Sequence, residues 1–240
     1  MDWKSWLKLT PVYDLFGKRS FSQSGEDILA WNLLGDRKGA PVHGFYVDIG
    51  AFHPKVFSNT YLFYKRGWRG VCVEPNPEAK WKFKMVRPRD TFVNVGVIPR
   101  TQELKNSRTQ NDELTYFVFD EGATNTFSAE VAEENKKVGR KLIKTIRIPV
   151  MEINSLLKKY VPEKQKIDLL SIDVEGMDEA ILKSIDWKKW KPEVVVCEEI
   201  RTQISDVRSQ MEKFFGEKGY EMVGKTGYSV IYRKSSLGKK

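Results

Sequence analysis

Acidic residues close four short apolar segments of the chain, and carboxylates in such positions bind cofactors or accept protons. The segments with their acids are Phe45–Ile49 with Asp48, Gly70–Val73 before Glu74, Lys166–Ile172 before Asp173, and Glu193–Cys197 before Glu198 and Glu199. Short apolar runs are typical of strands buried in a parallel sheet. Because open α/β sheets bind ligands at the carboxyl ends of their strands, we expect these acids to line one edge of a sheet.

The segment from Gly44 to Pro77 has the pattern of a strand, a tight turn, a helix and a second strand that ends in an acid. Gly50 and Ala51 follow the first strand and are small enough for a ligand to approach the backbone. In dinucleotide-binding folds a carboxylate at the tip of the second strand, here Glu74, holds two ribose hydroxyls. Only one glycine is present where a pyrophosphate-binding turn has three, so the pattern favours a cofactor without phosphate, such as S-adenosylmethionine.

An ordinary strand-to-helix turn is the alternative interpretation of this segment. Gly50 would then serve only close packing, and Glu74 would cap the helix that begins after Pro75-Asn76-Pro77. A single-glycine turn does not decide between the two. First-turn or capping roles are also the ordinary use of acids at helix starts, and we interpret Asp178 and Glu179 in that way.

Several short motifs occur along the chain in the order in which one known family has them. They are Ser22–Asp27 (SQSGED), Val47–Ala51 (VDIGA), His53-Pro54, Ser58–Thr60, Gly67–Gly70, Glu74–Pro77, and Leu170–Gly176 (LSIDVEG) with Asp178. In these motifs the chain resembles the FkbM-type methyltransferases, a class I S-adenosylmethionine-dependent family. The resemblance implies a Rossmann-like α/β fold, with a mostly parallel seven-stranded sheet, helices on both faces and a C-terminal antiparallel hairpin.

The predicted cofactor site collects residues from the ends of several strands. Gln23 or Glu26, in the N-terminal motif, is expected to cover the methionine end of the cofactor, with Ser24 as an alternative cap of the following helix. The full predicted set is Gln23, Asp48, Gly50, Ala51, Asn59, Glu74, Pro75, Asn94, Gly96 and Asp173.

Methyl transfer from a sulfonium releases a neutral thioether, so an enzyme mainly has to align the acceptor oxygen and remove its proton. The resemblance associates the chain with a sugar or glycan acceptor, whose weakly acidic hydroxyl needs a base. Asp173 and Glu175 are the predicted catalytic bases, with His53 as the alternative; a turn carboxylate and a helix-start residue are the plainer interpretations of Glu175 and His53. Asp173, Glu175 and Glu198 or Glu199 could also converge on Mg²⁺, but their spacing is not diagnostic and the metal is left unassigned.

The remaining segments predict the elements around this site. Further strands are expected at Thr91–Val97 and in a closing hairpin of Tyr220–Val223 and Tyr228–Arg233. Helices are expected at Glu26–Leu34, Ser58–Arg66, Pro77–Val86, Asn154–Tyr160, Met177–Ile185 and Ile204–Glu217.

Residues 100–150 are too many for a simple connection between neighbouring strands. They contain a predicted strand at Glu113–Phe119, a helix at Ser128–Val138 and a strand at Ile146–Val150. We expect this insertion to be a lid or an acceptor-recognition segment, with Tyr116, Asn125 and Thr126 facing the acceptor and not the cofactor. The whole chain, 1–240, is predicted to be a single methyltransferase domain with an N-terminal helical arm at 1–40.

Composition limits the other classes of function. The 240 residues carry a formal net charge of +9, mostly as lysine and arginine doublets, and they have no RNP-type signature. A nucleic acid is therefore a second-rank partner, and an RNA or protein methyltransferase or a non-catalytic relative remains the alternative. The only cysteines, Cys72 and Cys197, fall inside strand segments, which favours a reducing, cytoplasmic compartment. The sequence predicts neither a signal peptide nor a membrane span, and it indicates no oligomeric state.

Overall fold

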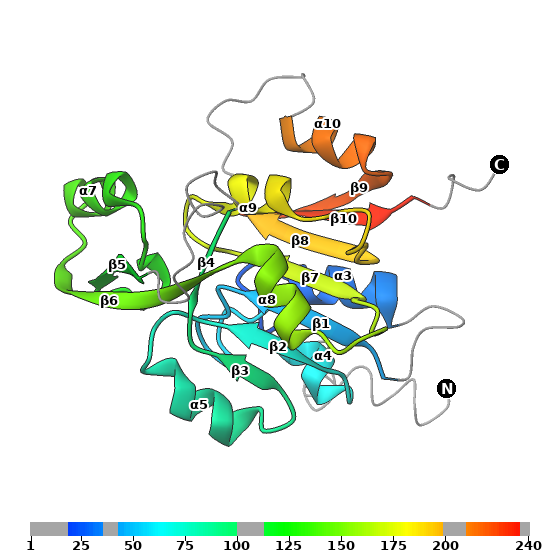
Figure 1. The fold of residues 1–240 in the computed structure, drawn as a ribbon, viewed down its shortest axis with the longest axis horizontal. Helices are drawn as coiled ribbons and strands as arrows, with labels where there is room; N and C mark the ends of the chain where they lie inside the picture. Colours follow the sequence, from blue (N-terminus) through cyan, green and yellow to red (C-terminus); the bar gives the residue numbers. More distant parts are fainter. Residues whose placement is uncertain (1–18, 36–42, 100–112, 199–209, 236–240) are drawn as a thin grey trace, which may run out of the picture.

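The computed structural model describes residues 19–35, 43–99, 113–198 and 210–235, and its central element is a seven-stranded sheet (Figure 1). The strand order is β3-β2-β1-β7-β8-β10-β9, in which the pairs from β3 to β8 are parallel and β10 pairs antiparallel with both neighbours. These strands are β1 Phe45–Ile49, β2 Arg69–Val73, β3 Thr91–Val93, β7 Leu169–Ile172, β8 Val194–Glu198, β9 Tyr220–Lys225 and β10 Ser229–Lys234. The predicted fold, including the C-terminal hairpin, is confirmed.

Helices cover both faces of this sheet. Strand side chains point alternately to the two faces, so Val47 and Ile49 pack toward one side and Tyr46 toward the other. The first face is covered by α8 Ile153–Tyr160, α9 Asp178–Ser184 and α10 Gln210–Glu217, and the second by α3 Glu26–Leu34, α4 Tyr61–Lys65 and α5 Ala79–Val86. Because the sheet is buried on both sides, its carboxyl edge is where a ligand can reach the strands.

The insertion forms a second, three-stranded sheet of order β4-β6-β5, which projects to the left of the main sheet in Figure 1. Its elements are β4 Gly96–Ile98, β5 Glu113–Phe119, the 3₁₀ turn η1 Gly122–Thr124, α7 Ala129–Lys137 and β6 Leu142–Glu152. The Ser128 side chain accepts a hydrogen bond from the Val131 amide and caps α7, which lies within the helix predicted at Ser128–Val138. The strand expected at Ile146–Val150 is longer than predicted, because it pairs along its length with β5 and then with β4.

The single strand predicted at Thr91–Val97 is wrong. The chain leaves the main sheet after Val93 and joins the small sheet at Gly96, so β3 and β4 belong to different sheets. The side-chain Nδ2 of Asn94 donates to the backbone carbonyls of Glu74 and Pro75, over 2.8 and 2.9 Å, and these two bonds replace the strand ladder at the break. An apolar run alone does not reveal such a change of sheet.

Several predicted segments lie wholly or partly outside the residues that the structure describes. Residues 1–18 of the predicted arm, Ile204 to Ser209 of the predicted last helix, and Glu199 lie outside the described residues. Ser24 does not cap α3, because the residue at the cap is Gly25, and the hydroxyl that accepts from the Gly25 and Asp27 amides is that of Ser22. In the part of the chain that the structure describes, no helix has the length and apolar character needed to cross a membrane.

Candidate active site

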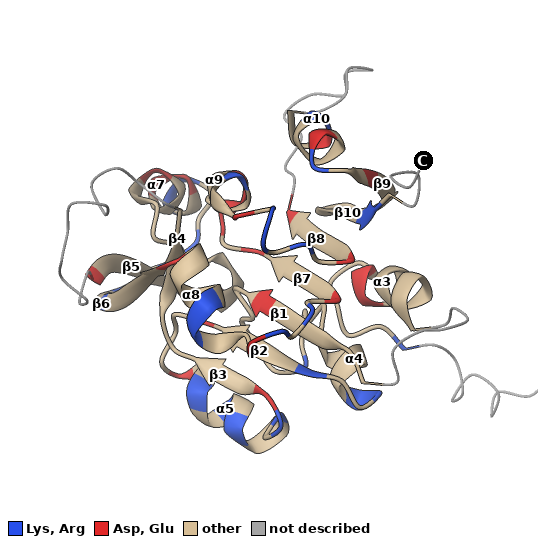
Figure 2. Ribbon diagram, turned by 45° about the vertical axis from the view of Figure 1, so that its right-hand side comes forward, with Lys and Arg blue, Asp and Glu red and all other residues tan. Residues whose placement is uncertain are grey.

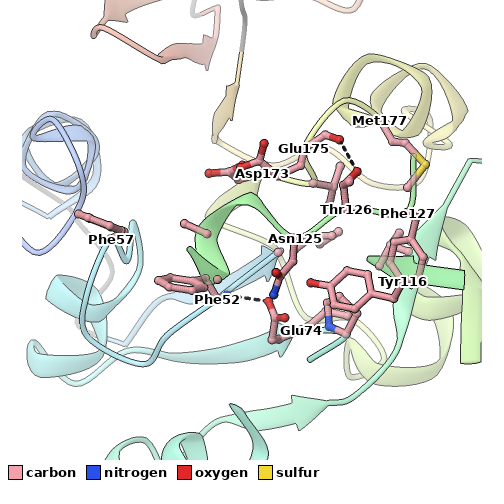
Figure 3. Close-up of a pocket in the computed structure, with 18 of the residues that line it drawn as sticks. Phe52, Phe57, Glu74, Tyr116, Asn125, Thr126, Phe127, Asp173, Glu175 and Met177 are labelled. Atoms are coloured by element: carbon pink, nitrogen blue, oxygen red, sulfur yellow. Dashed lines mark hydrogen bonds between the residues drawn. The ribbon is translucent and has the colours of Figure 1, made fainter. Parts of the chain in front are cut away.

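A pocket lies at the carboxyl ends of β1, β2 and β7, where the acids were expected to meet (Figure 3). β1 and β8 each carry an acid near the carboxyl end, Asp48 and Glu198, and the arrows of both strands have red tips in Figure 2. Glu74, Asp173 and Glu175 line the pocket itself, together with residues of the first turn and of the insertion. The cavity therefore combines carboxylates from separate strands with an apolar wall.

The turn after β1 requires glycine at position 50. Gly50 has a φ of 78°, and a Cβ built on it would lie 1.6 Å from the carbonyl oxygen of Asp173. The Gly50 and Ala51 amides both donate to the Val73 carbonyl, over 2.9 and 3.0 Å, so the turn is fixed against β2. The backbones of β1, β2 and β7 thus meet at one point, so Gly50 serves the close packing that the alternative interpretation gave it, and it also lines the pocket.

Glu74 is buried, with 4% of its surface exposed, and it accepts two backbone hydrogen bonds. The Phe52 amide donates to Oε2 over 2.9 Å and the Asn76 amide to Oε1 over 2.8 Å. Burial raises the pKa of Glu74 to about 7, against the opposing effect of the two amides. A carboxylate oxygen can accept more than one hydrogen bond, so the side chain still has capacity for two further donors from the pocket.

Asp173 and Glu175 follow β7 and form an acidic group with Asp178 and Glu198. The Asp173 side chain keeps contact with solvent, but the surrounding protein removes much of its hydration and raises its pKa, and the carboxylates of Asp178 and Glu198 raise it further. Burial and Glu198 raise the pKa of Glu175 to about 7. A carboxylate with a raised pKa is a better proton acceptor than a free one, which suits a general base.

Backbone strain is concentrated around this pocket. The described residues other than glycine with positive φ are Phe52, Phe57, Lys164 and Glu175, and all but Lys164 line the cavity. Such conformations cost on the order of 1–3 kcal/mol each and are typical of functional sites, where the surroundings hold them. The strain marks the first turn and the Glu175 turn as parts of one site.

The insertion forms the opposite wall of the pocket. Tyr116, Asn125, Thr126 and Phe127 line the same cavity as Glu74, and the rings of Tyr116 and Phe127 are 4.6 Å apart. Asn125 is held in place because its Oδ1 accepts a 2.8 Å hydrogen bond from the Phe119 amide. The expectation that these residues face an acceptor and not a cofactor stays a prediction, since they share one cavity with Glu74.

Six of the predicted residues line the pocket, and the other six do not. Those at the cavity are Gln23, Gly50, Glu74, Pro75, Asp173 and Glu175. Those outside its lining are Asp48, Ala51, His53, Asn59, Asn94 and Gly96. Glu26 is also directed elsewhere, because its carboxylate accepts from the Ser24 amide and the Thr226 hydroxyl, so Gln23 is the motif residue at the pocket.

Asp48 lies beneath the turn in a buried polar network. Thr60 donates to Asp48, and the Arg87 guanidinium donates to Thr60 and forms a 2.6 Å ion pair with Asp90. Burial raises the pKa of Asp48, and the Arg87 charge opposes that rise. Asp48 therefore supports the turn from below and does not face the pocket.

Three other predicted residues have structural contacts. Asn59 donates to the Ser171 hydroxyl over 3.1 Å and joins the α4 segment to β7. The Ala51 side chain packs in the core beneath the turn. A Cβ at Gly96 would lie 2.4 Å from the Phe127 ring, so this glycine allows the insertion to pack.

His53 lies in the turn before α4. Its Nδ1 accepts hydrogen bonds from the amides of Lys55 and Val56, and desolvation together with the charges of Lys82 and Lys55 lowers its pKa. These bonds favour the structural interpretation of His53 over that of a base.

The sequence analysis did not identify Phe52, Phe57 or Arg87 as residues of this region. No sequence pattern indicates that an arginine is buried, but two aromatic residues in a polar turn could have been recognised.

No group of three or more histidine, cysteine, aspartate or glutamate side chains is placed to hold a metal ion among the described residues. Glu199, one of the carboxylates considered for Mg²⁺, lies outside that part of the chain. Cys72 and Cys197 are both buried, and neither forms a disulfide bond within the described residues.

Comparison with known proteins agrees with this geometry. A family model described as the methyltransferase FkbM domain matches residues 48–222, which is most of the chain and includes every strand end at the pocket. The chain is also similar to methyltransferase sdnD of Sordaria araneosa, with 29% identity over 84 residues, or 32% of this chain and 32% of that protein. The chain thus matches about a third of the length of that curated relative.

Proposed function

The chain belongs to the FkbM methyltransferase family, and from that premise we propose that it uses S-adenosylmethionine to O-methylate a hydroxyl of a sugar, glycan or glycosylated metabolite. One observation carries the cofactor part. Glu74 lines the pocket with two N–H donors on its carboxylate and no ion pair to a described cation, beside a glycine turn in which a Cβ would clash. This arrangement fits a nucleoside that has ribose hydroxyls and no phosphate.

Binding and orientation follow from the residues around the pocket. Glu74 would accept the two ribose hydroxyls, and Tyr116, Phe127 and Val97 would enclose the adenine ring. The Gly50 turn leaves space for the amino-acid end, with Gln23 nearby. When bound, S-adenosylmethionine supplies an activated methyl group on a sulfonium.

Proton removal is the step that the acidic group can perform. Glu175, whose pKa is about 7, is the base that we favour, because it is partly ionised near neutral pH and still a strong acceptor. Its neighbour Asp173 would hold the acceptor hydroxyl in line with the methyl group. Glu175 would take the proton of the acceptor hydroxyl as that oxygen becomes the nucleophile, and bound S-adenosylmethionine would supply the methyl group.

The positive charge gives little support to a nucleic-acid acceptor. A groove at the amino ends of β7 and β8 is lined by several lysines, among them Lys164, Lys166 and Lys191. These strand ends are opposite the edge that carries Glu74 and Asp173, and the blue segments of Figure 2 are spread over several helices, including α4, α5 and α8. A phosphate backbone at the pocket would instead meet the carboxylates of Glu74, Asp173 and Glu175, which repel it.

A transfer assay tests the proposal. The purified protein is incubated with S-adenosylmethionine labelled in its methyl group and with separate acceptor pools of methyl glycosides, total RNA and a denatured protein mixture. Label in the glycoside pool, with base-stable ether linkage, supports O-methylation of a sugar. Label only in RNA or protein would replace the sugar with that acceptor, and cofactor binding without any transfer would favour a non-catalytic relative. The two buried cysteine thiols, which form no disulfide bond within the described residues, are consistent with the cytoplasm as its place of action.

A further inference from the structure

An aromatic pair at one end of the pocket has no role in the site described so far. The rings of Phe52 and Phe57 lie 6.3 Å apart with 19° between their planes, which is a stacked arrangement. Phe57 is 51% exposed and its neighbour Val56 is 49% exposed. An exposed phenylalanine ring buries little apolar surface, so the Phe57 side chain contributes little to the stability of the fold.

The backbone that presents the pair is strained. Phe52 has a φ of 47° and Phe57 of 56°, in the left-handed region that bulky side chains rarely adopt. This arrangement lowers the stability of the fold in two ways. The left-handed backbone is strained, and the aromatic ring that it presents stays in contact with solvent. A binding role explains why the ring is held at the cavity in spite of both costs.

The two rings are not equivalent. Phe52 is anchored, because its amide donates to Glu74 and its ring packs against the insertion, where a Cβ at Gly122 would lie 3.3 Å from its Cε2. The Phe57 ring lies nearly parallel to the Phe52 ring, lines the cavity and is half exposed to solvent. The fixed ring thus serves as a support for the exposed one.

The pocket has two apolar ends with carboxylates between them (Figure 3). Tyr116, Phe127 and Met177 lie at one end and Phe57 at the other, while Glu74, Asp173 and Glu175 lie between. Adenosine has one planar ring system, which would fit between the apolar side chains at the end with Tyr116, Phe127 and Met177. The end at Phe57 is therefore left for the second substrate.

We infer that Phe57, supported by Phe52, is the acceptor platform, which stacks against the C–H face of a pyranose ring while Asp173 and Glu175 accept hydrogen bonds from its hydroxyls. The inference rests on the proposed function and extends it to the acceptor site. The face of an aromatic ring carries a partial negative charge that attracts polarised C–H groups. A saturated ring that carries hydroxyls presents both kinds of group, which matches an aromatic face beside carboxylates.

The test measures sugar binding directly, without turnover. Saturation-transfer difference NMR is recorded on the full chain with S-adenosylhomocysteine and, in turn, the methyl pyranosides of glucose, galactose and mannose. The variants are Phe57→Ala, Phe57→Leu, which keeps apolar bulk, and Phe57→Tyr, which keeps the aromatic face. Met85→Ala, at an exposed apolar side chain of α5, is the matched control.

The inference predicts signals from pyranose ring protons in the unmodified protein and in Met85→Ala. Phe57→Ala and Phe57→Leu should reduce them by about fivefold or more, and Phe57→Tyr should keep them. Affinity for S-adenosylmethionine, measured by titration calorimetry, should stay within about twofold in every variant. Sugar signals that survive in Phe57→Ala and Phe57→Leu, or no sugar signal in a protein that binds the cofactor, would overturn the platform. Loss of cofactor binding in the unmodified protein would instead overturn the proposed function.

Discussion

The side-chain hydroxyl of Thr126 donates a 3.2 Å hydrogen bond to the backbone carbonyl of Glu175. This bond joins the insertion to the turn that holds the proposed base. The same hydroxyl accepts a 3.0 Å bond from the Ser128 amide, and Val131 of α7 packs against Gly176, where a Cβ would lie 3.2 Å from Val131 Cγ2. The insertion therefore positions the Glu175 turn in addition to closing the pocket.

Thr126→Val tests this positioning. Valine keeps the shape but removes both hydrogen bonds, each worth about 1 kcal/mol, so unfolding should become easier by about 1–2 kcal/mol. Turnover should fall about three- to tenfold because Glu175 is less firmly held. Thr115→Val, on β5 of the same insertion, is the control and should keep full turnover. An unchanged rate in Thr126→Val, with the stability loss present, would limit Thr126 to a structural role.

Gly50→Ala should abolish cofactor binding. The added Cβ would lie 1.6 Å from the Asp173 carbonyl, and the φ of 78° disfavours any side chain, so the turn has to move. Titration with S-adenosylmethionine should give no measurable heat of binding, and the melting temperature should fall by several degrees. Gly227→Ala, where a Cβ meets nothing within 4 Å, should leave both values unchanged. Normal cofactor affinity in Gly50→Ala would remove the turn from the site.

The acidic pair should control the chemical step. Glu175→Gln and Asp173→Asn keep the shape but remove the charge, and loss of a general base lowers turnover by about 10²- to 10⁴-fold. Glu179→Gln, an exposed carboxylate on α9, is the control and should retain turnover. Because a base must be ionised, the rate of the unmodified enzyme should rise with pH and level off above the Glu175 pKa of about 7. A pH-independent rate together with an active Glu175→Gln variant would exclude Glu175 as the base.

Asp178 should make stability depend on pH. Its Oδ1 has no hydrogen-bond partner among the described residues, and burial, followed by Glu198, raises its pKa to about 8. The unfolded aspartate titrates near pH ~4, so the folded state binds a proton that the unfolded state has lost between those two values. The contribution of this group is thus complete below about pH 4 and is lost as the pH rises through about 8.

Asp178→Asn removes that titration. At each pH the melting temperature of the unmodified protein is subtracted from that of the variant, both measured by calorimetry at constant ionic strength. This difference should increase by several degrees between pH 5 and pH 8.5. Glu130→Gln, at an exposed position of α7, should show no such trend. A constant difference across this range would contradict the raised pKa of Asp178.

The sequence could predict much of this architecture because the signals were local. Apolar runs that end in acids identified β1, β2, β7 and β8, and the single glycine of the first turn pointed to Gly50 and Glu74 together. The sheet that buries those runs also forces their ends to one edge, so local pattern and tertiary position agreed.

The rest depended on long-range packing that spacing does not encode. Asp48 has the sequence position of a ligand but accepts a hydrogen bond from Thr60, which in turn accepts one from the buried Arg87, 27 residues after Thr60. Phe52 and Phe57 take part in the site through a left-handed backbone that only the fold enforces. Thr126 and Glu175 are 49 residues apart in the sequence, and no local motif predicts the hydrogen bond between them.

Titration calorimetry with S-adenosylmethionine on the unmodified protein, Glu74→Gln and Glu78→Gln tests the central claim most directly. Glu78 is the matched control, because it is an exposed carboxylate just beyond the same strand. The unmodified protein and Glu78→Gln should bind with equal affinity. Glu74→Gln should bind more weakly by about 1.5 to 3 kcal/mol, the range for hydrogen bonds to a charged group, which is about 10- to 150-fold in Kd. Equal affinity in all three proteins, with the fold of Glu74→Gln intact by circular dichroism, would contradict the assignment of this pocket as the cofactor site.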